Sequence, residues 1–401
     1  MTGPDDSTAD STAASTADST AASTAASTVG VAAAAAALPI DQGVVALTAA
    51  MVDIASVSGD ERTLADAIER VLSIHAPHLE VLRDGDAIVA RTHLGRTQRV
   101  IIAGHIDTVP VNDNLPSRLE AGEYGDAESG TLWGRGTVDM KGGCAVMLAL
   151  AVELAAPAYD VTWVWYDHEE VEASLNGLGR LARARPELLV ADFAILGEPS
   201  NAGIEGGCNG TLRFELAASG RRAHSARAWM GVNAIHALAP ALDLLASFEP
   251  DTIEVDGLAY REGLNAVGVV GGVAGNVIPD EAVLTVNYRF APDKSVAEAE
   301  RQVRALFALV APELRLTVTD ASGGARPGLD APLAQHFIAA VGGTPAPKYG
   351  WTDVARFAEL GIPAVNYGPG DPSLAHTDDE RVPVAQLLAC ERGLRAWLSG
   401  V

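Results

Sequence analysis

The sequence is short of positive charge and of long apolar runs, and each shortage excludes a class of protein. Of its 401 residues, 28 are Lys or Arg and 52 are Asp or Glu, so the formal net charge is −24. Binding to nucleic acid needs a basic surface, and we therefore expect no nucleic-acid partner. No apolar run reaches the roughly 18 residues of a membrane-spanning helix, so we also expect no membrane insertion.

Cysteine is scarce as well. The chain has three cysteines, Cys144, Cys208 and Cys390, which are odd in number and widely spaced. This pattern predicts neither a disulfide framework nor a thiolate metal site. Isolated thiols are typical of proteins in a reducing compartment, so the sequence predicts a cytoplasmic protein.

The first 37 residues lack both periodic apolar positions and basic side chains. They are a Ser/Thr/Ala repeat, and the first basic residue of the chain is Arg62. A secretory signal peptide begins with positive charge, whereas a repeat of this composition is typical of disorder. We expect a disordered tail over residues 1–37, either a solvated extension or the product of a start codon placed too early.

Beyond the tail, strand patterns alternate with helix patterns. Short apolar runs rich in β-branched residues, typical of strands buried on both faces, occur at residues 100–104, 161–166, 193–196 and 364–367. Helix patterns between and around them cover residues 42–56, 61–74, 143–154, 174–183 and 384–397. This alternation predicts an α/β layer.

Residues 211–319 have a different order of elements. The pattern is strand (211–218), helix (231–247), strand (266–273), strand (282–290), helix (296–309) and strand (314–319). This order is that of the ferredoxin-like split unit. We therefore predict a catalytic α/β domain, residues 38–210 and 326–401, interrupted by a ferredoxin-like α+β domain at residues 211–325.

Side chains that bind metal ions or transfer protons follow the predicted strands and turns at five places. Side chains two apart on an extended chain share a face, so an aspartate two residues after a histidine can orient it, as metal-binding histidines commonly require. The five places are H-I-D with His105 and Asp107, G-R-G-T-V-D-M-K with Asp139, D-H-E-E with Glu169 and Glu170, G-E-P-S with Glu198, and A-H-T-D-D-E with His376.

Any one of these residues alone would be explained as a strand end or a helix cap. Together they indicate a metal site, because the carboxyl ends of strands in an open α/β sheet line one crevice. Imidazole and carboxylate ligands without thiolate suit Zn²⁺, Co²⁺ or Mn²⁺, and one aspartate can bridge two ions ~3.5–4 Å apart. A phosphate loop at the Asp139 motif is the rival interpretation, but Lys141 is followed by Gly142 and the required G-K-[S/T] is absent.

The adjacent Glu169 and Glu170 would have different roles in such a site. Neighbouring side chains on an extended backbone point to opposite sides, so we expect Glu170 to face a metal ion as a ligand. Glu169 would then face the attacking water, take its proton and pass it to the leaving amine.

The five motifs together resemble the zinc aminoacylase and carboxypeptidase family, which includes succinyl-diaminopimelate desuccinylases, acetylornithine deacetylases and glutamate-type carboxypeptidases. The resemblance extends from His105 to Glu380. It implies a zinc-peptidase-like sheet, a two-metal amidohydrolase and two zinc ions per subunit, with Co²⁺ or Mn²⁺ as substitutes. It also implies a cis peptide bond after Asp139. The implied roles are His105 and Glu198 on one ion, Glu170 and His376 on the other, Asp139 bridging both, Glu169 as general base and Asp107 as an assisting carboxylate.

The resemblance further implies that the inserted domain is a lid through which two subunits form a homodimer. In R-R-A-H-S-A-R, His224 matches a lid histidine that stabilises the developing oxyanion in the partner's site. Arg289 in N-Y-R-F and Asn276 in G-N-V-I-P match lid positions that bind a substrate carboxylate, and Thr352 in Y-G-W-T-D is a further candidate contact to the substrate.

The late segments Y-G-W-T-D-V-A-R-F-A and N-Y-G-P-G-D-P-S-L-A-H-T are most similar to one branch of the desuccinylases. That branch implies hydrolysis of N-succinyl-LL-2,6-diaminopimelate to succinate and LL-2,6-diaminopimelate, in lysine and diaminopimelate biosynthesis. One feature departs from the pattern: many desuccinylases have arginines before the Gly that enters the lid, whereas Cys208 and Asn209 stand here. A succinyl carboxylate would need another cation, with Arg222, Arg227 and Arg289 as candidates.

Two other functions stay open. Deacylation of another N-acyl amino acid, N-acetylornithine above all, or cleavage of a C-terminal peptide bond would use the same residues. A non-catalytic, metal-dependent binding protein on this scaffold would usually have lost a ligand or the base, whereas all six positions are filled here.

Overall fold

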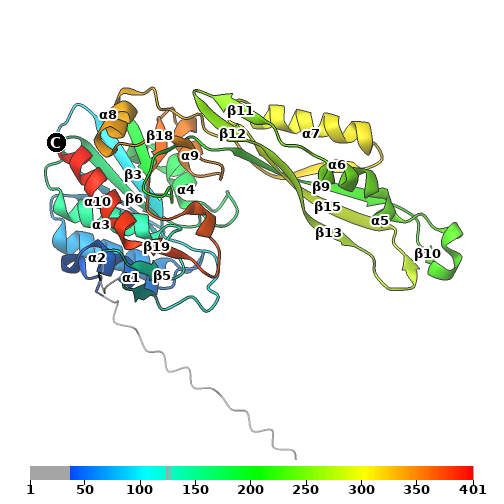
Figure 1. The fold of residues 1–401 in the computed structure, drawn as a ribbon, viewed down its shortest axis with the longest axis horizontal. Helices are drawn as coiled ribbons and strands as arrows, with labels where there is room; N and C mark the ends of the chain where they lie inside the picture. The colour runs from blue at the N-terminus through cyan, green and yellow to red at the C-terminus, as the bar shows by residue number, and fades with distance from the viewer. Residues whose placement is uncertain (1–36, 123–125, 127, 401) are drawn as a thin grey trace, which may run out of the picture. The chain divides into compact units, whose positions relative to one another are not determined.

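The computed structural model describes residues 37–122, 126 and 128–400. The largest sheet of this described part has eight strands in the order β1-β2-β6-β3-β7-β18-β8-β17 (Figure 1). Its middle strands run parallel. All residues of β6 and all but the first of β3 are buried, as expected for strands covered on both faces. The middle strands are β6 (Asp160–Tyr166), β3 (Arg99–His105), β7 (Phe193–Leu196) and β18 (Ala364–Asn366).

Further short strands complete the sheet on both sides. The hairpin of β1 (Glu80–Asp84) and β2 (Ala87–Arg91) adds to β6 in antiparallel fashion. On the other side, β8 (Glu205–Gly206) runs antiparallel to β18 and parallel to β17 (Ala346–Pro347). Sequence patterns predict none of these four strands; β8 and β17, with two residues each, are too short to show any periodicity.

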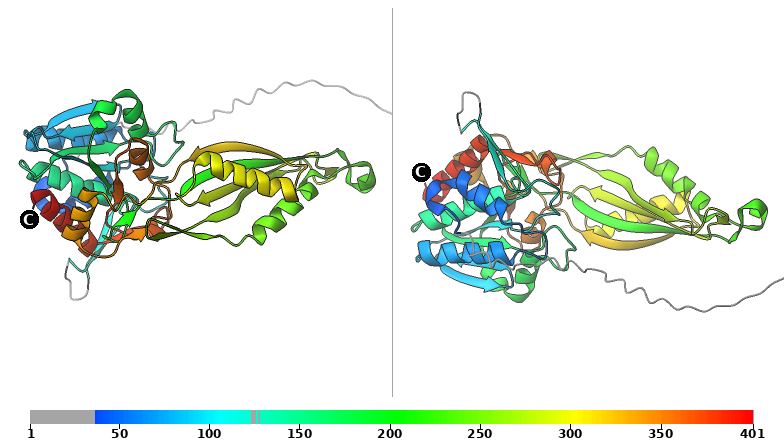
Figure 2. Two further views of the ribbon diagram at one scale, coloured as in Figure 1. Left: turned by 90° about the horizontal axis from the view of Figure 1, so that it is seen from above. Right: turned by 90° about the horizontal axis from the view of Figure 1, so that it is seen from below.

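Helices cover both faces of this sheet (Figure 2). One core contains one face of the strands and the apolar sides of α1 (Val44–Asp53), α2 (Arg62–His75), α3 (Lys141–Glu153), α8 (Pro332–Val341) and α10 (Val384–Ser399). The other core contains the opposite face of the strands with α4 (Gly177–Ala184) and α9 (Val354–Glu359). Alternate strand residues belong to different cores, for example Ile102 to the first and Ile101 to the second. The predicted α/β layer is confirmed.

A second sheet has four antiparallel strands in the order β13-β15-β9-β16. We call residues 210–322, which contain it, the inserted module. Along the chain its elements follow the order strand, helix, strand, strand, helix, strand, which is the ferredoxin-like order expected from the sequence. Its main elements are β9 (Gly210–Ser219), α5 (Ala234–Ala237), α6 (Ala239–Ala246), β13 (Gly263–Gly271), β15 (Glu281–Phe290), α7 (Val296–Val310) and β16 (Arg315–Ser322).

The single helix expected at residues 231–247 was a wrong prediction, because two short helices stand there. α5 begins after Asn233, whose side-chain oxygen accepts hydrogen bonds from the amides of Ile235 and His236. Pro240 lies in the first turn of α6. A proline there cannot donate to the carbonyl of residue 236, which interrupts a continuous helix and favours a new start.

The remaining strands are short. They form a three-stranded sheet of β4 (Arg118–Glu120), β5 (Thr131–Trp133) and β19 (Arg381–Pro383), and the pairs β10 (Ala223–His224) with β14 (Val277–Ile278) and β11 (Thr252–Val255) with β12 (Leu258–Arg261). In the described part of the chain, every helix is too short or too polar to cross a bilayer. The tail predicted at residues 1–37 lies outside the described residues except for Ala37.

Candidate metal centre

The parallel strands of the large sheet end at one edge, and the candidate metal ligands follow these ends. His105 is the last residue of β3, Glu170 lies four residues after β6, and Glu198 lies two residues after β7. Asp139 comes from the turn before α3, and His376 from the loop after β18 and a short helix, η5 (Pro372–Leu374). The tertiary structure thus brings residues from five segments of the chain to one place, as expected at the carboxyl edge of an α/β sheet.

Asp139 lies at the centre of this cluster, and its two carboxylate oxygens contact different histidines. Oδ1 is 3.0 Å from Nε2 of His105, and Oδ2 is 3.3 Å from Nε2 of His376. Each histidine also faces one glutamate: Nε2 of His105 is 3.9 Å from Oε1 of Glu198, and Nε2 of His376 is 3.0 Å from Oε1 of Glu170. The five side chains form two halves that share Asp139, and the peptide bond that follows this aspartate is cis.

The charge balance of the cluster fits bound cations. The side chains of Asp139, Glu170 and Glu198 are 15%, 8% and 6% exposed, and none of them forms an ion pair with Lys or Arg among the described residues. Burial, together with the charge of Asp139, raises the pKa of Glu198 to about 8. Buried carboxylates are normally paired or coordinate metal ions, and imidazole nitrogen with carboxylate oxygen is a donor set that divalent transition metals accept.

The two histidines lie in the negative field of these carboxylates. Burial by itself would lower the pKa of His105, but its contacts with Asp107 and Asp139 outweigh burial and raise this pKa well above its usual value. Contacts with Asp139 and Glu170 raise the pKa of His376 to about 10. A field that stabilises a proton on both rings also stabilises a cation held between them.

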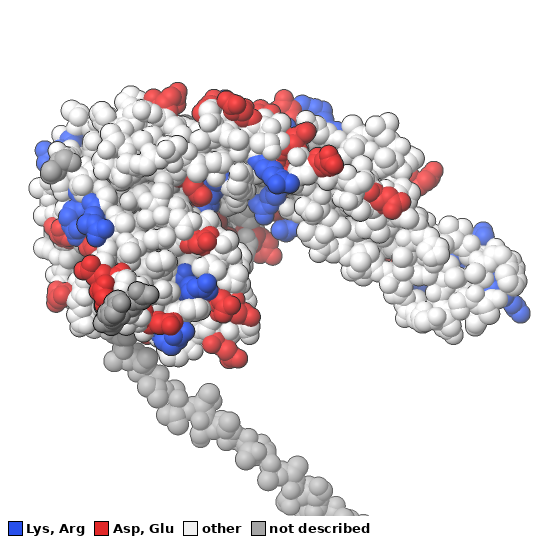
Figure 3. Space-filling model, viewed as in Figure 1, with Lys and Arg blue, Asp and Glu red and all other residues white. Residues whose placement is uncertain are grey.

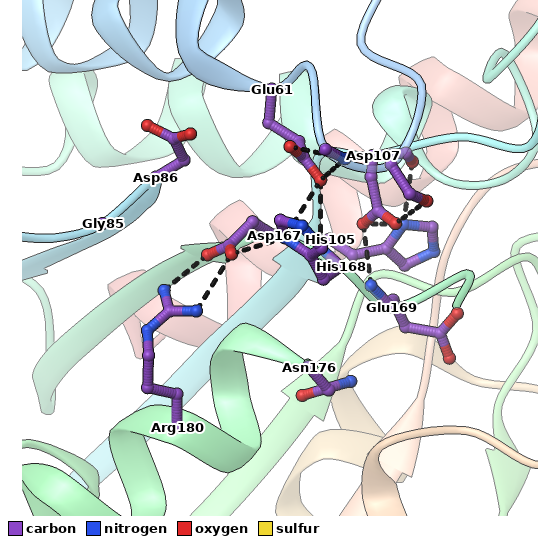
Figure 4. A network of polar contacts seen from close by, with 12 residues as sticks. Glu61, Gly85, Asp86, His105, Asp107, Asp167, His168, Glu169, Asn176 and Arg180 are labelled. Carbon is purple, nitrogen blue, oxygen red and sulfur yellow. Dashed lines mark hydrogen bonds and ion pairs between the residues drawn. The ribbon is translucent and has the colours of Figure 1, made fainter. Parts of the chain in front are cut away.

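Asp107 connects the His105 side of the cluster to the adjacent glutamates (Figure 4). Its Oδ1 accepts the amide of Glu169 at 3.0 Å, and its Oδ2 accepts the amide of Glu170 at 3.0 Å and the hydroxyl of Ser58 at 2.6 Å. Nδ1 of His105 lies 3.0 Å from the Asp107 carbonyl oxygen. One fully buried residue therefore fixes both the histidine and the backbone of the glutamate pair.

The glutamate pair does not lie on an extended strand. The prediction that strand alternation points the side chains of Glu169 and Glu170 to opposite sides was therefore wrong. β6 ends at Tyr166, and His168 has a φ of 58°, in the left-handed region, which turns the chain before the pair. The turn and the hydrogen bonds to Asp107 set the direction of each side chain. Glu170 contacts His376, while desolvation raises the pKa of half-buried Glu169 well above its usual value.

A second network lies behind this turn and was not expected from the sequence (Figure 4). Nδ1 of His168 is 2.7 Å from Asp167 and 3.3 Å from Glu61, which is fully buried. Arg180 donates to both oxygens of Asp167, at 2.7 and 3.0 Å. Glu61 also accepts the amides of Gly59 and His168. The adjacent Asp and His of D-H-E-E were the only local signal, because Glu61, which contacts His168, and Arg180, which binds Asp167, stand far from each other in the sequence.

Glu380 connects the turn that carries Asp139 to the segment that carries His376. Its buried Oε1 accepts the amides of Gly136, Val138 and Asp139, at 2.9, 3.0 and 3.1 Å. Its Oε2 accepts a hydrogen bond from Arg135 at 2.8 Å. Glu380 follows His376 by only four residues and binds the amide of Asp139, which lies 241 residues away in the sequence. This one carboxylate therefore fixes the segments that carry two candidate ligands relative to each other.

A hollow of about 830 Å³ lies beside the glutamate pair. Glu169 and Glu170 line it together with Arg213 and Arg289 of the inserted module and Arg356 of α9. Figure 3 shows acidic and basic side chains spread over the viewed face, with one group of basic side chains beside a recess. Of the expected substrate contacts, Arg289 therefore lines a space that adjoins the candidate base.

The other expected contacts lie elsewhere. Thr352 is buried, and its hydroxyl donates to Oδ1 of Asn366 at 3.0 Å. His224 and Asn276 are neighbours in the inserted module, where the amide of Ser225 donates to the Asn276 carbonyl oxygen at 2.9 Å. His224 lines a separate hollow with Arg221, Arg222 and Arg227. None of the described contacts joins His224 or Asn276 to the metal cluster of the same chain.

Comparisons with known proteins match this arrangement to one family. The family model described as peptidase family M20/M25/M40 matches residues 101–399. A Mycobacterium tuberculosis protein is 53% identical over 354 residues, which cover 88% of this chain and 97% of the relative; its name assigns it provisionally as succinyl-diaminopimelate desuccinylase DapE. A Corynebacterium glutamicum protein named succinyl-diaminopimelate desuccinylase is 46% identical over 361 residues, covering 88% of this chain and 96% of the relative.

Solved structures show the same fold at lower identity. A tripeptidase from Staphylococcus aureus superposes with a TM-score of 0.72 at 21% identity, and the match covers 90% of this chain and 98% of that chain. At this identity the similarity concerns the fold alone. It confirms the expected fold class, because a single superposition covers nearly all of both chains.

The first prediction concerns Glu380. Glu380→Gln should lower the free energy of unfolding by about 3–5 kcal/mol, because it leaves the buried Arg135 without its anionic partner. Urea unfolding of the two proteins would measure the difference. Glu187→Gln is the matched control, since Glu187 pairs with Arg185 at the surface, where such pairs contribute at most about 1 kcal/mol. Equal losses in the two variants would contradict the positioning role of Glu380.

Proposed function

The chain belongs to peptidase family M20/M25/M40 and is a metal-dependent amidohydrolase, and we propose that it hydrolyses N-succinyl-LL-2,6-diaminopimelate to succinate and LL-2,6-diaminopimelate. The names of the relatives at 53% and 46% identity support this substrate. The reaction would belong to lysine and diaminopimelate biosynthesis, in the cytoplasm.

The arrangement of side chains around Asp139 is the main observation that supports this activity. Two histidine–glutamate pairs meet the two oxygens of one aspartate, and Glu169 stands next to them at the edge of an open hollow. Metal-dependent hydrolysis of an amide needs ligands that bind metal cations, a general base and space for the substrate. The three requirements are met within one continuous group of side chains.

We propose that two Zn²⁺ ions bind in each subunit, with Co²⁺ or Mn²⁺ as substitutes. His105 and Glu198 would hold one ion, Glu170 and His376 the other, and Asp139 both. When bound, the ions would supply Lewis-acid polarisation of the scissile carbonyl and a lowered pKa for the attacking water. The separation of the five side chains into two halves that share Asp139 supports two ions rather than one.

The residues of the chain would move the proton and hold the substrate. Glu169 would accept a proton from the attacking water and deliver it to the nitrogen of the leaving diaminopimelate. Its raised pKa suits this work, because the carboxyl group has to hold the proton between the two transfers. Asp107 would orient Glu169 through its backbone amide, and Arg289 would bind a carboxylate of the substrate at the wall of the hollow.

We also propose that the enzyme is a homodimer and that the inserted module is a lid and the dimer interface. β13 is an edge strand of the four-stranded sheet, and its Val267, Val269 and Val270 are 58%, 60% and 76% exposed. An apolar strand at the edge of a sheet, without a neighbouring strand on its outer side, favours pairing with another chain. Such a dimer would let His224 reach the site of the partner and donate to the developing oxyanion. None of the described contacts joins His224 to the cluster of its own chain, which is consistent with a role in the partner's site.

A substrate profile tests the proposed activity. The purified protein should release free amine from N-succinyl-LL-2,6-diaminopimelate much faster than from N-acetylornithine or from a dipeptide. Chelation should abolish the reaction and zinc should restore it, as measured by an amine assay and by metal analysis of the same samples. Preference for the acetyl substrate or the dipeptide would keep the metal chemistry and reject the proposed substrate.

Replacement of the base gives a second test. Glu169→Gln should lower kcat by about 100-fold or more, because the amide cannot accept the proton, while the bound zinc per subunit stays unchanged. Glu187→Gln, at the surface, should keep both wild-type activity and wild-type metal content. If Glu169→Gln retains a large part of the activity, another residue is the base.

The dimer can be tested at the exposed edge. Val269→Arg combined with Val270→Arg should convert the dimer to a monomer in analytical ultracentrifugation and reduce kcat, since His224 would lose access to the partner's site. Leu309→Arg on α7, where the side chain is 83% exposed, should leave the dimer intact. A wild-type protein that is an active monomer would reject both the interface and the role of His224.

A further inference from the structure

Two arginines of the inserted module stand side by side in the wall of the hollow next to Glu169. Arg213 lies on β9 and Arg289 on β15, and both line the hollow. In the register of these strands Arg213 pairs with Asn287, and Arg289 pairs with Thr211. The two arginines therefore occupy diagonal positions on neighbouring strands and share one face of the sheet.

This face is the one that the helices of the module leave open. Leu212 and Phe214, which flank Arg213 on β9, are buried in the core that the sheet forms with α6 and α7. Phe214 contacts Phe307 of α7 with ring centroids 5.6 Å apart. Because side chains alternate along a strand, Arg213 points to the opposite side, where it is exposed to the hollow.

Neither of the two guanidinium groups has an anionic partner in the described structure. Arg289 donates from Nε to Oδ1 of Asn287 at 3.1 Å, and no ion pair forms with either arginine among the described residues. Asp320 on β16 is the register partner of Arg213 and lines the same hollow. Asp320 and Arg213 nevertheless form no ion pair. Burial and the nearby charge of Arg213 lower the pKa of Arg289.

The other arginines near the site are already engaged. Arg356, the third arginine of the hollow, forms an ion pair with Asp353 and stacks on Trp351 at 5.4 Å. Arg222 pairs with Asp280 at 2.9 Å, and with Arg227 it lines the separate hollow of His224. The sequence offered Arg222, Arg227 and Arg289 as candidates to bind a succinyl carboxylate. Of these three, only Arg289 lines the hollow beside Glu169.

Two unpaired like charges side by side are unfavourable unless an anion lies between them. The guanidinium group is a planar fork that binds a carboxylate through two parallel hydrogen bonds. In a protein with a net charge of −24, a pair of arginines without a carboxylate partner, next to the candidate base, points to an anionic group of the substrate.

We propose that Arg213 is a specificity-determining residue that forms, with Arg289, a cradle for a carboxylate of the substrate. The inference rests on the proposed function and adds to it a residue that the sequence motifs do not mark. N-Succinyl-LL-2,6-diaminopimelate has two kinds of carboxylate near the scissile amide: the one of the acyl group and the α-carboxylate of the amine half. The same guanidinium chemistry serves either, and the test separates them.

The test uses the full-length, zinc-loaded Arg213→Gln variant. Its kcat/KM for N-succinyl-LL-2,6-diaminopimelate should fall about 10- to 100-fold, the range for loss of a hydrogen bond to a charged group, mainly through a higher KM. Arg213→Lys should recover part of the loss. Arg301→Gln on α7, where the arginine side chain is 68% exposed, is the matched control and should equal the wild type.

A second substrate identifies the carboxylate. N-Acetyl-LL-2,6-diaminopimelate has the same amine half but no carboxylate on its acyl group. If Arg213 binds the acyl carboxylate, its replacement should affect the succinyl substrate alone. If Arg213 binds the α-carboxylate, both substrates should lose a similar factor. Unchanged kinetics with both substrates would overturn the proposal and leave the proposed function intact.

Calorimetric binding of the two products, succinate and LL-2,6-diaminopimelate, gives a readout that does not depend on turnover. If the wild type hydrolyses neither substrate but binds one product more tightly than Arg213→Gln does, the cradle stands and the proposed function fails. If the wild type neither hydrolyses the substrates nor binds the products, both proposals fail.

Discussion

The crowding of carboxylates around Asp139 is the constraint on which the rest of the structure depends. Asp139, Glu170 and Glu198 converge on two histidines, and no described Lys or Arg forms an ion pair with them. Burial raises the pKa values of both glutamates. Such a cluster resists assembly, because desolvation and like charge both oppose it. It forms only where a rigid frame holds its members, and the buried parallel strands β6, β3 and β7 provide that frame.

Two further carboxylates, those of Asp107 and Glu380, complete the frame by accepting hydrogen bonds from the backbone of the segments that carry the candidate ligands. Asp107 accepts the amides of Glu169 and Glu170, and Glu380 accepts the amides of Gly136, Val138 and Asp139. Hydrogen bonds to a charged acceptor are stronger than those between neutral groups. The loops that carry the candidate ligands have no regular secondary structure to fix their geometry. Hydrogen bonds from their amides to buried carboxylates fix it instead.

The candidate catalytic residues and the proposed substrate-binding arginines lie on different parts of the chain. The fold is shared with a tripeptidase at 21% identity, and a fold of this kind is compatible with many substrates. The metal cluster belongs to the large sheet, whereas the hollow beside it is walled on one side by the polar face of β9 and β15. Exposed residues of that face, such as Arg213, can vary without disturbing the core formed by Leu212 and Phe214 on the other face.

The sequence by itself determined the order of the main elements and the identity of the candidate ligands, but not the short strands β1, β2, β8 and β17. Buried strands such as Phe193–Leu196 are visible as apolar runs, and His105, Asp139, Glu170, Glu198 and His376 stand out because they follow such runs or Gly-rich turns. Only the tertiary structure decided how Glu169 and Glu170 are directed, since the turn at His168 and the acceptor Asp107 set it. The same is true of the network that joins Glu61 to His168, His168 to Asp167 and Asp167 to Arg180, and of the neighbouring Arg213 and Arg289. These contacts join residues that are far apart in the sequence, and local patterns carry no information about distance in space.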